Sequence, residues 1–360
     1  MRAKTGFAST PRGTALAAFL AAGTALAGDA AYADQIKLLE TGSTLLLPLF
    51  SQWAADYQKA HPDVEIATQG TGSGAGIAQA VSGAVQIGAS DAYMSDAQMK
   101  SSSGVQNIPL AISSQMINYN VPGLNDQHLK FSGPVLAAIY AGEVKFWDDP
   151  PIARLNPGVS LPHNEIVPVH RTDGSGDTFI FTQYLSFSTP EWSKSAGYGL
   201  NVNWPAAQGA AGATGNPGMV STTKNTPYSI AYIGISFKNA TDSAGLGEAT
   251  LQNRNGRFVL PDATTVGAAV AEVAPETPPD ERISLIYAPG EQSYPIINYE
   301  YAIVKTQQPS AAIAKVVKDF LGWAIDPKGG NGQQYMQAVG FVALPGTIVT
   351  LSNYQINLIH

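Results

Sequence analysis

Gln69-Gly70-Thr71-Gly72-Ser73-Gly74-Ala75-Gly76 is the stretch that decides the fold. It follows an apolar run, Val64 to Ala67, that is typical of a buried strand, and it precedes a helical run that begins near Ile77. Glycine lets the backbone approach a ligand, and the first amides of a helix lack intrahelical acceptors. Because the helix dipole also favours negative charge there, the stretch predicts an anion site with Ser73 as a hydroxyl donor. A flexible turn with a serine cap fits the same residues equally well.

The same glycines also fit, loosely, the fingerprint of dinucleotide-binding proteins. Gly70, Gly72 and Ala75 match G-x-G-x-x-A, and Asp91 follows about 20 residues later. A P-loop is excluded, because no Gly-Lys-Ser or Gly-Lys-Thr follows the glycines. The dinucleotide interpretation leaves a second anion-like segment unexplained.

That second segment repeats the order of a strand, a Gly-Ser turn and a helix. It runs His170-Arg171-Thr172-Asp173-Gly174-Ser175-Gly176-Asp177-Thr178. The guanidinium of Arg171 is a planar fork that can bind two oxygens of a tetrahedral anion, and Asp173 can orient that fork through a salt bridge. Structural Arg–Asp pairs are common, so the pair alone does not establish a site.

An acidic residue, Asp91, ends a third short segment that begins at Gln86. It fits an ordinary helix cap. In an anion site it has a sharper role, because phosphate carries a proton at neutral pH and sulfate does not. A fixed carboxylate accepts a hydrogen bond from phosphate and repels sulfate, and a mismatch of this kind costs a few kcal/mol.

The first 33 residues are expected to be a removable signal peptide. Arg2, Lys4 and Arg12 form a basic leader, an alanine-rich apolar run follows, and Ala31-Tyr32-Ala33 gives a cleavage site before Asp34. The apolar run is shorter than the roughly 20 residues that span a bilayer. The chain has no cysteine, which excludes both disulfides and a lipid-modified N-terminal cysteine. We therefore expect a Sec-exported, soluble periplasmic protein without a lipid anchor, a compartment that also disfavours nicotinamide cofactors.

The charged residues of the chain limit which ligands and partners are expected. The net charge is −7 at pH 7, and it becomes more negative once the basic leader is removed. No cluster of Lys and Arg is present, so nucleic acid is not expected to bind. A small anion is still compatible with this charge, since local amide dipoles can hold it.

Alternating strand-like and helical runs predict an α/β fold with mostly parallel sheets. Helices are expected after Pro48 and from Ala311 to Ile325, each with apolar residues at three- to four-residue spacing. Leu110 to Val121 and Pro295 to Val304 are extended and apolar, and they are expected to cross between two lobes as a hinge; two ordinary strands in one lobe fit equally well. The boundaries predicted on this basis are 1–33 for the signal peptide, 34–115 and 295–360 for lobe I, and 116–294 for lobe II.

At this point the chain resembles the periplasmic phosphate-binding components of ABC importers, over about Leu39 to Leu344. The resemblance is strongest to the mycobacterial-type branch, and the order and spacing of the ligand segments agree as well. The family has the two-lobe (type II) periplasmic binding-protein fold with a two-strand hinge. The matching segments are Gly42-Ser43-Thr44-Leu45-Leu46, Gly70 to Gly76, Gly88 to Asp91, Lys145 to Pro150 with Leu155 to Gly158, and His170 to Phe179.

The resemblance implies high-affinity binding of inorganic phosphate between closing lobes and its delivery to membrane permease subunits, by a protein that acts as a monomer. It also implies which residues bind. The phosphate ligands would be Thr44, Leu45, Ser73, Asp91, Arg171, Ser175, Gly176 and Asp177, with Ser43, Gly72 and Asp173 in support.

Asp177 departs from the enterobacterial pattern, which has threonine at this position. If its carboxylate points inward, it would favour a ligand that carries a second proton, whereas an outward Asp177 would be a first-turn acid favoured by the helix dipole. We expect the inward orientation, because the mycobacterial-type branch shares this residue.

No enzyme, metal or cofactor is expected. The five histidines are scattered, and neither a Gly-x-Ser-x-Gly nucleophile motif nor a calcium loop is completed. His170, beside Arg171, lacks a nucleophile to activate, so we interpret it as packed or solvated. The remaining alternatives are a receptor for another tetrahedral oxyanion such as phosphonate and a nucleotide-dependent oxidoreductase.

Overall fold

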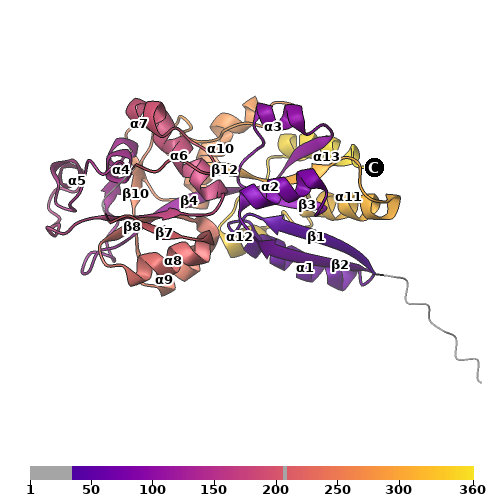
Figure 1. Ribbon diagram of the computed structural model, residues 1–360, viewed down its shortest axis with the longest axis horizontal. Coiled ribbons are helices and arrows are strands. Elements are labelled where there is room, and N and C mark those ends of the chain that lie inside the picture. The colour runs from indigo at the N-terminus through magenta and orange to yellow at the C-terminus, as the bar shows by residue number, and fades with distance from the viewer. Residues whose placement is uncertain (1–34, 206–208) are drawn as a thin grey trace, which may run out of the picture. The chain divides into compact units, whose positions relative to one another are not determined.

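Nine strands of the described residues form a sheet that runs through two lobes (Figure 1), in the order β2-β1-β3-β12-β4-β8-β6-β7 with β9 beside β4. The computed structural model describes residues 35–205 and 209–360, and the predicted signal peptide lies outside them. Residues 35–360 make up one compact unit. The two-lobe α/β fold expected from the sequence is therefore confirmed.

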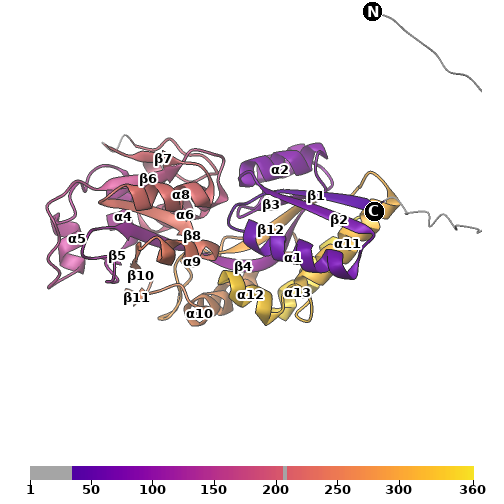
Figure 2. The same cartoon turned by 90° about the horizontal axis from the view of Figure 1, so that it is seen from below.

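Lobe I contains a parallel set of strands, β2-β1-β3. Helices cover both of its faces, with α2 on one side and α1, α11 and α13 on the other (Figure 2). Its elements before the crossing are β1 (Ile36–Gly42), α1 (Leu47–Ala60), β2 (Val64–Gly70), α2 (Ser73–Ser82), β3 (Ile87–Ser90) and α3 (Asp96–Ser101). Those after the return are β12 (Ile297–Lys305), α11 (Ala311–Ile325), α12 (Gln333–Val339) and α13 (Gly346–Asn357).

Lobe II contains a second parallel set, β8-β6-β7, against which α8 packs. A separate three-stranded sheet, β11-β10-β5, lies in the same lobe. Its elements are β5 (Lys130–Phe131), α4 (Gly133–Tyr140), α5 (Pro150–Leu155), β6 (Val167–Arg171), α6 (Gly176–Ser188), α7 (Pro190–Ser195), β7 (Ala211–Ala213), α8 (Gly215–Asn225), β8 (Ser229–Gly234), η1 (Ile235–Phe237), α9 (Lys238–Ser243), β9 (Gly247–Glu248), β10 (Thr250–Gln252), β11 (Phe258–Val259), α10 (Ala263–Val273) and η2 (Ala274–Glu276).

One long strand, β4 (Val105–Asn120), joins the two lobes. It pairs antiparallel with β12 as far as Ser114, and with β8 from Gln115 onward. The expected crossing by the first extended stretch is thus confirmed. The second stretch forms β12, which pairs only with β3 and β4, so the return crossing is made by the chain just before Ile297. We propose that the lobes divide where β4 changes partner, in line with the boundaries at 115 and 295.

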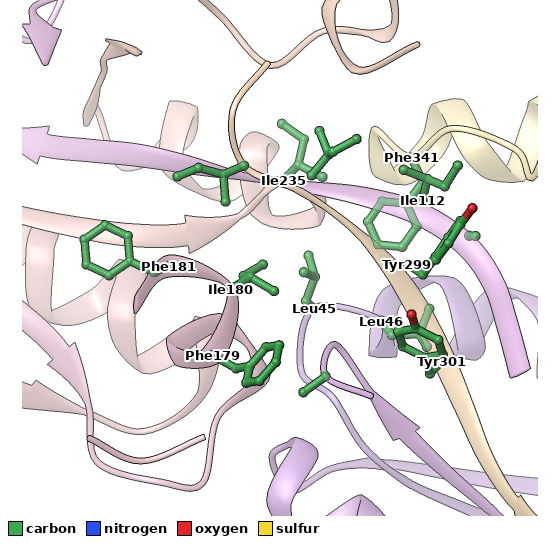
Figure 3. Packing of buried hydrophobic residues seen from close by; sticks show 14 of the residues in the cluster. Leu45, Leu46, Ile112, Phe179, Ile180, Phe181, Ile235, Tyr299, Tyr301 and Phe341 are labelled. Atoms are coloured by element: carbon green, nitrogen blue, oxygen red, sulfur yellow. The ribbon is translucent and has the colours of Figure 1, made fainter. Parts of the chain in front are cut away.

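Apolar side chains from both lobes meet beside this crossing (Figure 3). Leu45 lies in the turn before α1 and is fully buried, and it points toward Ile180 of α6 and Ile235 of η1. A side chain added at Gly234 of lobe II would collide with that of Leu45. Leu45 is therefore an apolar contact between the lobes as well as a predicted ligand.

The sequence of helix α1 explains where this helix begins, where it ends and which face it buries. Pro48 stands in the first turn, where its missing N–H costs nothing, and the helix ends at His61 before Pro62. The predicted apolar face is buried, and the indole N–H of Trp53 donates to the Gly330 carbonyl oxygen over 2.8 Å. Helix α11 spans the predicted residues, Ala311–Ile325.

Replacing Trp53 by Ala should destabilise lobe I by roughly 3–5 kcal/mol, because the substitution opens a cavity and leaves the Gly330 carbonyl oxygen without its donor. Urea unfolding measures this change. Tyr354→Ala, at a side chain that is 66% exposed, should change stability by less than about 0.5 kcal/mol. Equal effects of the two substitutions would contradict the packing described here.

Candidate functional site

The turn from β1 to α1 brings the first predicted ligands into contact with lobe II. Thr44 Oγ1 accepts hydrogen bonds from Asn216 of lobe II, over 3.1 Å from its amide and 3.0 Å from its side chain. The Ser43 hydroxyl donates to Asp91 Oδ1 and accepts from the Leu46 amide over 2.9 Å. Ser43 therefore supports the site by holding a carboxylate and the turn together.

Helix α2 begins at Ser73, four residues before the expected start near Ile77. The glycine-rich stretch therefore continues into the helix, and Gly72, with a φ of +90°, turns the chain into it. Gly72 has no side chain with which to cap the helix. The Ser73 hydroxyl donates to Asp91 Oδ2 over 3.2 Å and accepts from the Asp91 amide over 3.1 Å. The structure therefore does not contain the flexible turn with a serine cap that the sequence also allowed. Ser73 instead contacts Asp91, the acid of the predicted anion site.

The second segment has the predicted order of strand, turn and helix. Strand β6 ends at Arg171, and α6 starts at Gly176. Ser175 is the N-cap of α6 and accepts from the Thr178 amide over 3.1 Å, which leaves the hydroxyl hydrogen of Ser175 available to a ligand. Because β6 ends at Arg171 and α6 begins only a few residues later, this arginine and the first amides of α6, those of Gly176 and Asp177, belong to one short segment.

Arg171 is almost fully buried and is held by two acids. Its Nε donates to Asp173 Oδ1 over 2.7 Å, and a terminal nitrogen also bonds to Asp173. The other terminal nitrogen donates to Asp177 Oδ2 over 2.7 Å. A guanidinium has five N–H donors, so the two salt bridges fix the fork while leaving donors for a ligand.

Asp177 points inward. Besides Arg171, it accepts from the Asn216 side chain over 2.7 Å and from the Gln115 side chain over 3.2 Å. Burial, assisted by the negative charge of Asp91, raises the pKa of Asp177 to about 7. This carboxyl therefore titrates close to neutral pH, as the inward orientation requires.

Asp91 lies at the end of β3 with 1% of its surface exposed. Burial raises the pKa of Asp91, while the neighbouring Glu300, the hydroxyls of Ser43 and Ser73 that donate to Asp91, and the charge of Arg171 act in the opposite direction. The Asp91 backbone oxygen accepts from the Asn298 side chain. The acid is thus held in one orientation by contacts from the turn before α1, from α2 and from β12.

Backbone amides of both lobes converge on the same place. At these five positions the N–H donates to no other residue that the structure describes, in keeping with the orphan amides of helix starts. They are the amides of Thr44, Leu45, Ser73, Gly176 and Asp177.

The two lobes are closed on each other at this point. The Gly74 amide of lobe I donates to the Gly174 carbonyl oxygen of lobe II over 2.9 Å. A Cβ on Gly176 would lie 2.3 Å from Asp91 Oδ2 and 2.4 Å from Ser73 Oγ. Such separations are below any real contact, so only glycine permits this approach of α6 to lobe I.

The structure brings every predicted ligand and supporting residue to one place, and it adds three that the sequence analysis missed. Asn216 and Gln115 each bind Asp177, and Asn216 also binds Thr44. The third, Glu300, is fully buried beside Asp91. A Gly-Asn-Pro helix start at residues 215–217 was a sequence signal for Asn216, but Glu300 lay in an apolar strand pattern without one.

Three further observations bear on the catalytic, metal-binding and membrane-anchor alternatives. His170 stacks on Trp204 with ring centroids 5.1 Å apart, and its Nδ1 lies 3.1 Å from the Arg171 carbonyl oxygen, consistent with packing. In residues 35–205 and 209–360 there is no group of three metal-ligating side chains placed to hold an ion. No helix in the described part of the chain has both the length and the apolarity needed to cross a bilayer.

Fold and site together define a class, the two-lobe binding proteins that enclose an anion with amides from both lobes. A family model described as a PBP superfamily domain matches residues 21–328. The phosphate-binding protein PstS of Methanocaldococcus jannaschii is 36% identical, covering 90% of this chain and 86% of the relative, and that of Xylella fastidiosa is 32% identical, covering 87% and 83%. The chain belongs to the PstS family of phosphate-binding proteins within the PBP superfamily.

A solved structure has the same fold. A putative phosphate ABC transporter substrate-binding protein with bound phosphate from Clostridium perfringens superposes with a TM-score of 0.61. The alignment covers 86% of this chain and 100% of that one, at 17% sequence identity. At that identity the likeness supports the fold only.

Gly176→Ala should weaken anion binding roughly tenfold to a hundredfold, because the added methyl group occupies the space of the Asp91 carboxylate and holds the lobes apart. Calorimetric titration measures the loss. Gly267→Ala, where an added Cβ meets nothing within 4 Å, is the matched control and should bind normally. Normal binding by Gly176→Ala would mean that α6 does not close against Asp91.

Proposed function

We propose that this protein binds inorganic phosphate between its two lobes and delivers it to an ABC-type permease. The observation that supports this most directly is the set of unpartnered amides from both lobes, which occurs together with a buried arginine, Arg171, and a buried acceptor, Asp91. Amides and a guanidinium bind an oxyanion, and a buried carboxylate requires that the anion bring a proton. The names of the relatives do not favour a phosphonate receptor or an oxidoreductase.

The ligands we propose for phosphate, besides Asp91, come from three segments. In lobe I these are the Thr44 hydroxyl, the amides of Thr44 and Leu45, and the hydroxyl and amide of Ser73. In lobe II the amides of Gly176 and Asp177 and the Ser175 hydroxyl surround the ligand, and Arg171 is its cationic anchor. Because each lobe supplies only part of the set, full binding requires closure at the hinge.

Asp91 is the proposed source of selectivity. Ser43 and Ser73 already donate to its two oxygens, so the acceptor sites left over face the ligand. Monohydrogen phosphate has an O–H for such a site, whereas sulfate brings only negative charge at neutral pH. Phosphate and sulfate have the same shape, but phosphate forms a hydrogen bond with Asp91 whereas sulfate is repelled by it, and this difference makes the site selective.

We further propose that the protein works in the periplasm as a monomer and is not an enzyme. Support comes from the predicted signal peptide and from relatives named as binding proteins. A receptor that presents both lobes to a permease needs both of them accessible, which agrees with a monomer.

The wild-type protein should bind phosphate with roughly micromolar or tighter affinity and should not bind sulfate at neutral pH. Asp91→Asn should reduce the ratio of phosphate to sulfate affinity by roughly 100-fold, because the amide N–H donates to sulfate. Calorimetric titration of ligand-stripped protein with each ion measures this ratio. Retention of the wild-type ratio in a folded Asp91→Asn variant would contradict the role of Asp91, and tighter binding of sulfate by the wild type would refute the proposed function.

Asp177 should make phosphate binding dependent on pH. Since the pKa of Asp177 is about 7, its carboxyl loses its proton as the pH rises through that value, and the new negative charge opposes a dianionic ligand. The wild-type affinity should therefore fall between about pH 6 and pH 8, by up to roughly tenfold per unit, and Asp177→Asn should flatten this slope. Calorimetric titrations of both proteins with phosphate at several pH values measure this slope. Parallel profiles for the two proteins would show that Asp177 does not titrate against the ligand.

A further inference from the structure

A second buried acid, Glu300, lies on β12 beside the site, and the proposed binding chemistry does not use it. Its side chain has no exposed surface. Oε1 accepts a hydrogen bond from the Ser113 hydroxyl, while Oε2 has no partner among the described residues that a carboxylate could bind. In the antiparallel register of β12 and β3, Tyr301 pairs with Ser90, so the next residue along, Glu300, lies beside Asp91, and the two carboxyls interact.

The groups around Glu300 decide its protonation state. Asp91 at the end of β3 and Asp177 of α6 are both acids, and Arg171, the cation that acts on Asp91, is already bound by Asp173 and Asp177. An ionised Glu300 would add another negative charge to a fully buried place. Burial first, and then the charge of Asp91, raise the pKa of Glu300 well above its ordinary value.

We propose that Glu300 stays protonated and donates its carboxyl hydrogen to Asp91, and that this bond keeps Asp91 ionised as the proton acceptor for phosphate. Glu300 is thereby a positioning residue that determines specificity. The inference rests on the proposed function and extends it by one residue. Oε2, which has no donor to accept from, is the oxygen that carries the hydrogen.

The acceptor sites of Asp91 support this assignment. A carboxylate offers about four lone-pair sites. Ser43 and Ser73 occupy two of them, and the hydrogen of Glu300 occupies a third, which leaves one for the O–H of the ligand. Without Glu300, burial favours the protonated form of Asp91, and a protonated Asp91 donates to sulfate as readily as to phosphate.

The test compares Glu300→Leu with Glu300→Gln. In Glu300→Gln the amide N–H donates to Asp91 and Oε1 still accepts from Ser113, so selectivity for phosphate over sulfate should be retained. In Glu300→Leu the selectivity should fall roughly tenfold to a hundredfold, and the pH below which sulfate binds should move upward. Glu281→Gln is a control for the loss of a buried acid away from the site, because Glu281 binds Ser352 and Gln355, and its selectivity should be that of the wild type.

A spectroscopic measurement on ligand-free protein keeps the inference testable even if Glu300→Leu does not fold. At neutral pH the infrared band of protonated carboxyl groups should lose intensity in Glu300→Gln relative to the wild type. An unchanged band, wild-type selectivity and pH profile in a folded Glu300→Leu, or a Glu300→Gln variant as unselective as Glu300→Leu would each overturn the inference. A wild-type protein that fails to bind phosphate would refute the proposed function instead, and the infrared result would still report the proton on Glu300.

Discussion

Backbone amides that helix starts leave without acceptors are the constraint on which the rest of this structure depends. A helix cannot satisfy its own first N–H groups, and burying them without an acceptor costs about 1–3 kcal/mol each. Here the turn before α1 and the starts of α2 and α6 carry such amides in two lobes that touch each other. We propose that an enclosed anion satisfies them all at once, so that lobe closure and ligand binding are one event. The long strand β4, which pairs with both lobes, lets them approach without losing their common sheet.

Amides and an arginine attract any oxyanion, so selectivity needs an opposing element. We propose that three buried acids, Asp91, Asp177 and Glu300, supply it in a protein whose net charge is already negative. Their proximity means that they cannot all be ionised together, and protons must be distributed among the acids and the ligand. In this account the site recognises phosphate by where the protons are, in addition to the shape and charge of the ion.

The local patterns in the sequence predicted the main elements and pointed to Ser73, Asp91, Arg171 and Asp173, whereas the remaining proposed ligands came from the family resemblance. The spacing of apolar residues predicted α11 to the residue, and the two strand-turn-helix segments predicted where the orphan amides would lie. The start of α2 was misplaced by four residues, because glycines weaken the helical pattern although Ser73 already lies in the helix. Glu300 could not be predicted, since its role depends on β12 pairing beside β3 across more than 200 residues of chain, and a strand pattern does not show which acid another acid will face.

A crystal structure of the phosphate complex at a resolution that shows hydrogens tests the account most directly. The account predicts a single phosphate between the lobes, bound by the amides of Thr44, Leu45, Ser73, Gly176 and Asp177, with its O–H directed at Asp91. It would be contradicted by a phosphate bound to one lobe only, or by a hydrogen on Asp91 that is donated to the ligand.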